Sequence, residues 1–139
     1  MTHLRLSGSC LCNSVRYAIE GDLLAFNHCH CSRCRKATGT GHASNILLKP
    51  SAVEWSAGED LLTRYQVPEA KRFATVFCRL CGSLMPRVAP DMSLAVIAAG
   101  TLDHDPGIQP ERRIFEGSRA EWSCSADDLP GFEAYPPRQ

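Results

Sequence analysis

Short apolar runs, each closed by glycine, proline, aspartate or serine, follow one another along most of the chain. Val15, Tyr17 and Ile19 alternate with other residues and predict one face of a β-strand. Three further runs predict strands at residues 45–48, 73–77 and 94–99. Sustained 3.6-residue periodicity is hard to find, and the best helical candidate is the short stretch Ser32–Ala37, which Gly39 would end. The pattern predicts a mainly β protein.

Length and composition narrow the class of protein. The chain has 139 residues, of which 44% are hydrophobic and 22% charged, as is ordinary for one soluble domain. Its 15 basic and 15 acidic residues create no overall positive field, so neither nucleic acid nor a membrane surface is expected as a partner. The N-terminus lacks the layout of a signal peptide. We expect one cytoplasmic domain over residues 1–139, with an irregular, proline-rich tail at 128–138.

Seven of the eight cysteines fall in three short clusters, namely Cys10 with Cys12, Cys29 with Cys31 and Cys34, and Cys78 with Cys81. A reducing cytoplasm disfavours structural disulfides, so clustered cysteines there indicate metal binding or catalysis. The remaining residue, Cys124, stands alone, and an isolated cysteine is more often a small buried apolar side chain than a ligand.

The first and third clusters suit a single closed four-thiolate site. Cys78 and Cys81 flank a tight bend followed by Gly82, a residue that readily adopts the left-handed conformation such a bend requires. In an extended strand, Cys10 and Cys12 face the same way. Zinc prefers four ligands at tetrahedral angles, and thiolates are among its best donors. We therefore expect a structural zinc that joins the start of the chain to its centre.

The middle cluster brings three thiolates together within six residues, Cys29, Cys31 and Cys34. Three protein ligands with a vacant fourth position are typical of a catalytic zinc. Two alternatives remain open. Cys124 would complete a second structural zinc, or Cys31 and Cys34 would form a redox pair, although no thioredoxin-like pattern surrounds them.

Polar residues surround this middle cluster on both sides. His28 and His30 flank Cys29, but in an extended segment their rings point away from the sulfur atoms, so we do not expect them to bind the same ion. Arg33, Arg35 and Lys36 follow within the predicted helix. Beside a zinc with an open position, such cations would form a rim that binds anions.

The cysteine clusters and their neighbours carry a resemblance to a known family. The segments are Cys10–Tyr17, Cys29–Gly39, Arg72–Ser83, Gly100–Asp103 and Asp127–Phe132. Together they resemble the glutathione-dependent formaldehyde-activating enzyme family over about residues 8–132. One departure lies near the C-terminus, where Arg113 precedes Ile-Phe at a position that is often histidine in the family.

The resemblance implies a fold of several small coiled β-sheets built around zinc. It also implies two sets of zinc ligands, a structural one of Cys10, Cys12, Cys78 and Cys81 and a catalytic one of Cys29, Cys31 and Cys34. The implied reaction is that of a carbon–sulfur lyase, which adds a glutathione-like thiol to a small aldehyde such as formaldehyde and gives an S-(hydroxymethyl) adduct. We expect Arg35 and Lys36 to hold the carboxylates of the thiol, with Arg113 on the same rim.

Two other functions fit the same residues. Thiols add to formaldehyde readily without help, so a non-catalytic zinc module that binds glutathione or its adduct would carry the same site. A structural zinc domain for a protein partner would instead hold two closed four-ligand zincs, one of them including Cys124.

Overall fold

The computed structural model describes residues 1–123 and 128–138, in which β-strands dominate as the sequence predicts. The elements in chain order are β1 (His3–Ser9), β2 (Arg16–Cys29), α1 (Ser32–Thr38), β3 (Ala43–Ala57), the 3-10 helix η1 (Glu59–Leu61), β4 (Leu62–Gln66), β5 (Ala74–Cys78), β6 (Arg87–Val88), β7 (Ala95–Ala98), η2 (Ala99–Thr101), β8 (Arg112–Ile114) and η3 (Glu116–Ser118).

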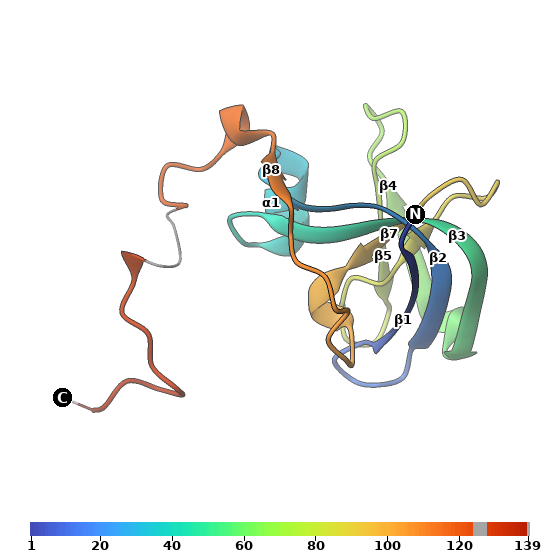
Figure 1. Cartoon of the computed structure of the whole chain (residues 1–139), viewed down its shortest axis with the longest axis horizontal. Helices are drawn as coiled ribbons and strands as arrows, with labels where there is room; N and C mark the ends of the chain where they lie inside the picture. The colour runs from blue at the N-terminus through green and yellow to red at the C-terminus, as the bar shows by residue number, and fades with distance from the viewer. Residues whose placement is uncertain (124–127, 139) are drawn as a thin grey trace.

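A long curved hairpin of β2 and β3 forms the centre of the larger sheet, whose strand order is β1-β2-β3-β7-β6 (Figure 1). β1 pairs with the first half of β2, and β8 runs parallel to its last three residues. Three register shifts interrupt the β2–β3 ladder and increase its twist and bending. At one of them a Cβ on Gly21 would collide with the backbone of Lys49, so glycine is required for the close approach.

The core lies on the inner face of this sheet. Tyr17 and Ile19 of β2 are buried, which confirms the predicted strand face for these two residues, and Val15 is buried just before the strand begins. They pack with apolar side chains of β1, β3 and β7, among them Leu6, Ile46, Leu48 and Ile97. Each fully buried side chain of this size stabilises the fold by roughly 1.5–3 kcal/mol before the loss of conformational entropy is counted.

The strands β4 and β5 form a separate two-stranded antiparallel sheet, in which Leu62 pairs with Cys78. β5 covers most of the apolar run predicted at 73–77, and β7 lies within the run predicted at 94–99. Cys78 is the last residue of β5, so this small sheet delivers the third cysteine cluster to the edge of the core.

The helix α1 lies in the connection between β2 and β3, where the sequence predicts a helix. The Sγ of Cys31 caps its first turn by accepting a hydrogen bond from the N–H of Cys34 at 3.3 Å. Gly39 ends the helix in the left-handed conformation, with φ of 71°, and its N–H donates to the carbonyl of Arg35. The predicted helix and its predicted end are confirmed.

Residues 128–138 form no strand and are exposed throughout, as expected for an irregular tail. Figure 1 shows this segment leading away from the sheets. Within the described residues, no helix combines the length and the apolar character that crossing a membrane requires.

Candidate metal centres

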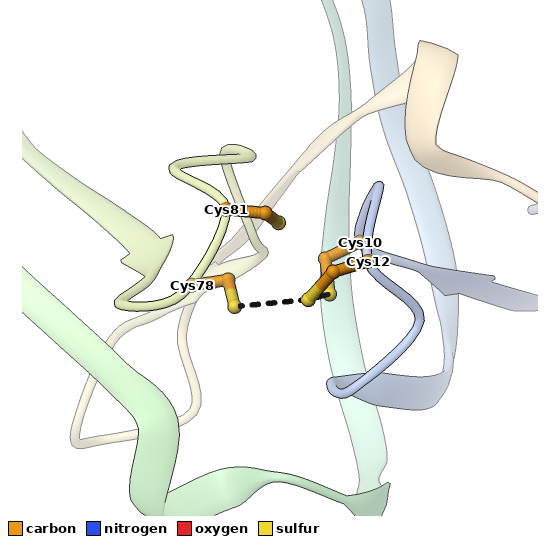
Figure 2. A group of neighbouring side chains, drawn as sticks. All are labelled: Cys10, Cys12, Cys78 and Cys81. Atoms are coloured by element: carbon orange, nitrogen blue, oxygen red, sulfur yellow. Dashed lines mark hydrogen bonds between the residues drawn. The ribbon is translucent and has the colours of Figure 1, made fainter.

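Four cysteines from two distant segments converge beside the core (Figure 2). Cys10 and Cys12 lie in the loop after β1, and Cys78 and Cys81 lie at the end of β5 and just beyond it. All four Sγ atoms are within 4.8 Å of one another. The Sγ atoms of Cys10 and Cys12 are 3.6 Å apart, and those of Cys12 and Cys78 are 3.9 Å apart. Tetrahedral zinc with bonds of about 2.3 Å places its sulfurs about 3.8 Å apart, so this donor set fits zinc.

Local hydrogen bonds hold the two loops of this first centre in place. Gly82 has φ of 78°, as the sequence predicts, and its N–H donates to the carbonyl of Cys78 at 2.8 Å. The hydroxyl of Ser83 accepts a hydrogen bond from the N–H of Leu11 and so joins the two loops directly. The Sγ of Cys10 accepts from the N–H of Val15 at 3.2 Å. Hydrogen bonds that involve the backbone of both loops therefore help to position the four sulfurs.

The thiols of this first centre differ in how easily they ionise. Hydrogen bonding with the hydroxyl and the N–H of Ser83 lowers the pKa of Cys81 to about 5. Hydrogen bonds from Ser14 likewise lower the pKa of Cys12, whereas burial raises the pKa of Cys78. Ionisation is thus easier for Cys81 and Cys12 than for an ordinary cysteine, and the thiolate is the form that binds metal.

Three further cysteines converge at the other end of β2. Cys29 is the last residue of that strand, Cys31 caps α1, and Cys34 lies in its first turn. Their Sγ atoms are within 4.8 Å of one another. Cys29 and Cys34 are buried and Cys31 is partly exposed. Because Cys10 and Cys12 precede β2 and Cys29 ends it, the two groups of sulfurs form separate centres.

The environment of this second centre singles out one thiol. Burial raises the pKa of Cys34 and, less strongly, the pKa of Cys29. Burial opposes ionisation of Cys31 as well, but hydrogen bonds from the N–H groups of Cys34 and Arg33 and from neighbouring thiols outweigh it and lower the pKa. Cys31 is therefore the thiol of this group that is most readily ionised, and a metal would complete the ionisation of the others.

An open cavity of about 500 Å³, here named the thiol cavity, exposes the second centre. Its lining combines the three cysteines with apolar residues of β3, β7 and β8. Arg33 and Arg87 also line it, and each guanidinium lies 5.9 Å from the centre of the Phe73 ring, at the outer limit of a cation–π contact. The volume suits a small organic ligand, and the two cations suit a negatively charged one.

A family model described as glutathione-dependent formaldehyde-activating enzyme matches residues 5–118, a stretch that contains all seven clustered cysteines. The chain belongs to this family. A solved structure, described as a crystal structure of a Rhodobacter sphaeroides protein from a structural genomics programme, is similar in fold with a TM-score of 0.51. It shares 24% sequence identity over 78% of this chain and 98% of its own. Among curated proteins, none matches the chain significantly.

In this member of the glutathione-dependent formaldehyde-activating enzyme family, the three basic residues expected to bind substrate do not line the thiol cavity. Arg35 and Lys36 lie on α1, and Arg113 lies on β8, 3.5 Å from the carboxylate of Glu116. The cations that line the cavity are Arg33, part of the basic segment noted in the sequence, and Arg87 from β6. Cys124, the alternative fourth ligand, lies outside the described residues.

Three histidines cluster near the second centre without joining it. The rings of His28 and His42 stack with centroids 4.0 Å apart, and the ring of His30 lies 5.2 Å from that of His42. None belongs to either group of converging ligand atoms found in the described residues. Burial, followed by repulsion from neighbouring histidines, lowers the pKa of both His28 and His42 and favours their neutral forms.

Proposed function

We propose that the chain is a zinc-dependent carbon–sulfur lyase that adds a glutathione-like thiol to a small aldehyde. Membership of the family supports chemistry of glutathione and formaldehyde at a general level. The observation that carries the proposal for this chain is the group of three sulfurs that opens onto a cavity of about 500 Å³. A group of three leaves room for a ligand from solution, which a closed group of four does not.

The two groups of sulfurs have different roles in this proposal. A structural zinc would be held by Cys10, Cys12, Cys78 and Cys81, and a second zinc by Cys29, Cys31 and Cys34. When bound, the second zinc would supply a cation that lowers the pKa of an incoming thiol and keeps it as a thiolate. The three-sulfur geometry and the soft donors fit such an ion.

The charge balance of the second centre explains the role of the nearby arginines. Three thiolates around Zn²⁺ carry a net charge of −1, and an incoming thiolate makes it −2. Arg33 and Arg87 line the same cavity and bring two positive charges to it. They would offset this charge and draw the anionic thiol into the cavity.

The proposed reaction forms one carbon–sulfur bond. The sulfur of the bound thiol attacks the carbonyl carbon of the aldehyde, and the electron pair of the carbonyl bond moves onto oxygen. That oxygen takes up the proton that the thiol has lost, so thiol and aldehyde combine without loss of any atom. Apolar side chains of Leu47, Val96 and Ile114 line the same cavity and would limit the access of water.

The rate of adduct formation tests the proposal. Zinc-loaded protein should accelerate formation of S-(hydroxymethyl)glutathione above the uncatalysed rate, as followed by NMR exchange spectroscopy. Cys31→Ser should lose this gain, because it removes the most readily ionised ligand. Cys124→Ser is the matched control, and it should keep the gain if Cys124 is not a ligand. Equal rates with and without protein would contradict the lyase and leave glutathione binding as the function.

Metal content provides a second, independent readout. We expect two zinc ions per chain in the wild type and one in Cys31→Ser, measured by elemental analysis. With cobalt in place of zinc, added glutathione should change the visible absorption of the wild type, because a new thiolate enters the coordination shell. Two closed centres that do not respond to any thiol would favour a structural zinc domain for a protein partner.

A further inference from the structure

A second cavity of about 510 Å³ lies beside the thiol cavity and is strongly basic. Four cationic side chains line it, those of Arg64, Lys71, Arg72 and Arg87, against the single carboxylate of Asp91. They come from β4, from the β4–β5 turn and from β6, so only the folded chain brings them together. We call this hollow the basic cavity.

The basic cavity and the thiol cavity share a wall. Arg87, Leu94 and Val96 line both of them. Arg87 is half-buried, and its Nη1 donates a hydrogen bond to the carbonyl of Arg72 at 2.7 Å, which fixes the guanidinium between the two hollows. The two cavities are therefore neighbours on the surface of the folded chain, with Arg87 on the border between them.

The positive charge of the basic cavity is largely uncompensated. The carboxylate of Asp91 accepts hydrogen bonds from the N–H of Ser93 at 3.0 Å and from its hydroxyl at 2.6 Å, so it is engaged within its own loop. Within the described residues, none of the four cations forms a salt bridge. Burial, followed by repulsion from Arg64, lowers the pKa of Arg87. Several positive charges in one concave site favour the binding of an anion that offers several oxygen atoms.

We propose that the basic cavity is a binding subsite for an acidic group at the far end of the thiol substrate. This inference rests on the proposed function and assigns the place where the acidic end of its glutathione-like thiol binds. Small neutral thiols would occupy the thiol cavity alone. In this proposal Arg64 and Arg72 help to determine which thiol is bound, although they do not line the thiol cavity.

Titration with inorganic phosphate tests the subsite without any thiol chemistry. Calorimetry on the zinc-loaded protein should show binding that weakens about tenfold in Arg64→Gln/Arg72→Gln, since two charge-assisted contacts are lost. The control Arg16→Gln/Lys49→Gln removes two charges from exposed positions on β2 and β3 and should bind phosphate as the wild type does. Equal affinity in all three proteins, or no binding to any, would overturn the subsite. The same titration with glutarate compares the affinity of the basic cavity for a dicarboxylate with its affinity for phosphate.

A pair of thiols tests whether the subsite serves the substrate. Wild-type protein should bind glutathione about tenfold more tightly than glutathione diethyl ester, whose carboxylates are blocked. Arg64→Gln/Arg72→Gln should lose this preference and keep its affinity for 2-mercaptoethanol. An unchanged preference would overturn the inference. If no thiol binds to the wild type, the proposed function fails, and the phosphate titration still decides whether the basic cavity binds anions.

Discussion

At the scale of single residues, Tyr17 shows how the core accommodates a polar atom. Its side chain is 2% exposed, and its hydroxyl lies 2.7 Å from the hydroxyl of Thr101. The ring meets Trp55 edge-to-face with centroids 6.0 Å apart. Burial raises the pKa of Tyr17 to about 12 from an ordinary value of 10.0. The neutral phenol is thus the form that the folded protein holds.

Tyr17 should make the fold sensitive to strongly alkaline pH. The folded chain holds this proton more tightly than the unfolded chain, so the contribution is complete below pH 10 and is lost as pH rises towards 12. The free energy of unfolding should fall by up to about 3 kcal/mol across that window. Urea unfolding of wild type and Tyr17→Phe at several pH values measures it. Parallel pH profiles for the two proteins would contradict the assignment.

Gly8 should tolerate no side chain. A Cβ at this position would collide with the carbonyl oxygen of Thr101 and with the ring of Tyr17. Gly8→Ala should therefore destabilise the fold by about 1–3 kcal/mol, the usual cost of overpacking. Gly100→Ala is the matched control, because its Cβ would meet nothing within 4 Å. Thermal unfolding of both variants decides the matter, and equal melting temperatures would count against the packing described for Gly8.

At the scale of elements, the pattern of apolar residues predicts where strands occur better than it predicts their length. The run at 45–48 covers only a part near the start of β3, a strand of 15 residues. Lys49 and Pro50 would ordinarily mark the end of a strand, yet Pro50 pairs with Gly21 next to a register shift. Such bulges depend on the partner strand, so the sequence of β3 alone does not reveal them.

The end of α1 should influence the second metal centre. Gly39 has φ of 71°, and a Cβ in that conformation costs about 1–2 kcal/mol in a helix of only seven residues that carries Cys34. Gly39→Ala should weaken zinc binding by Cys29, Cys31 and Cys34 about tenfold, as measured by competition with a chelator. Zinc at the first centre should be unaffected, and Gly117→Ala should behave as the wild type. Equal weakening at both centres would contradict a local effect of the cap.

At the scale of the whole molecule, the spacing of the cysteines predicts much of the candidate site. The division into a group of four and a group of three agrees with the two groups of sulfurs that the fold brings together. The spacing does not predict that Arg87 and Phe73 border the thiol cavity, because these residues lie about 40–50 positions beyond Cys34. Phe73, the residue before β5, packs against Cys29 and Cys34, and Arg87 of β6 lies over its ring. These tertiary contacts decide the proximity, and no local pattern encodes them.

Metal removal should affect the two centres differently. The first joins the β1–β2 loop to the end of β5, whereas the second lies within the single connection from β2 to β3. Cys78→Ser should therefore lower the melting temperature strongly and resemble treatment with a chelator, since metal binding contributes directly to folding. Cys31→Ser should lower it by only a few degrees. Calorimetry of both variants tests this, and equal losses would contradict separate roles.

The position of the two centres at opposite ends of β2 has a consequence for divergence among related proteins. Substitutions that reshape the cavity beside Cys31 leave the distant ligands, and the core between them, untouched. Selection can therefore change which substrate binds without lowering the stability of the fold. Related proteins with this layout can therefore acquire new substrates through single mutations beside Cys31, while the first metal centre and the core stay the same.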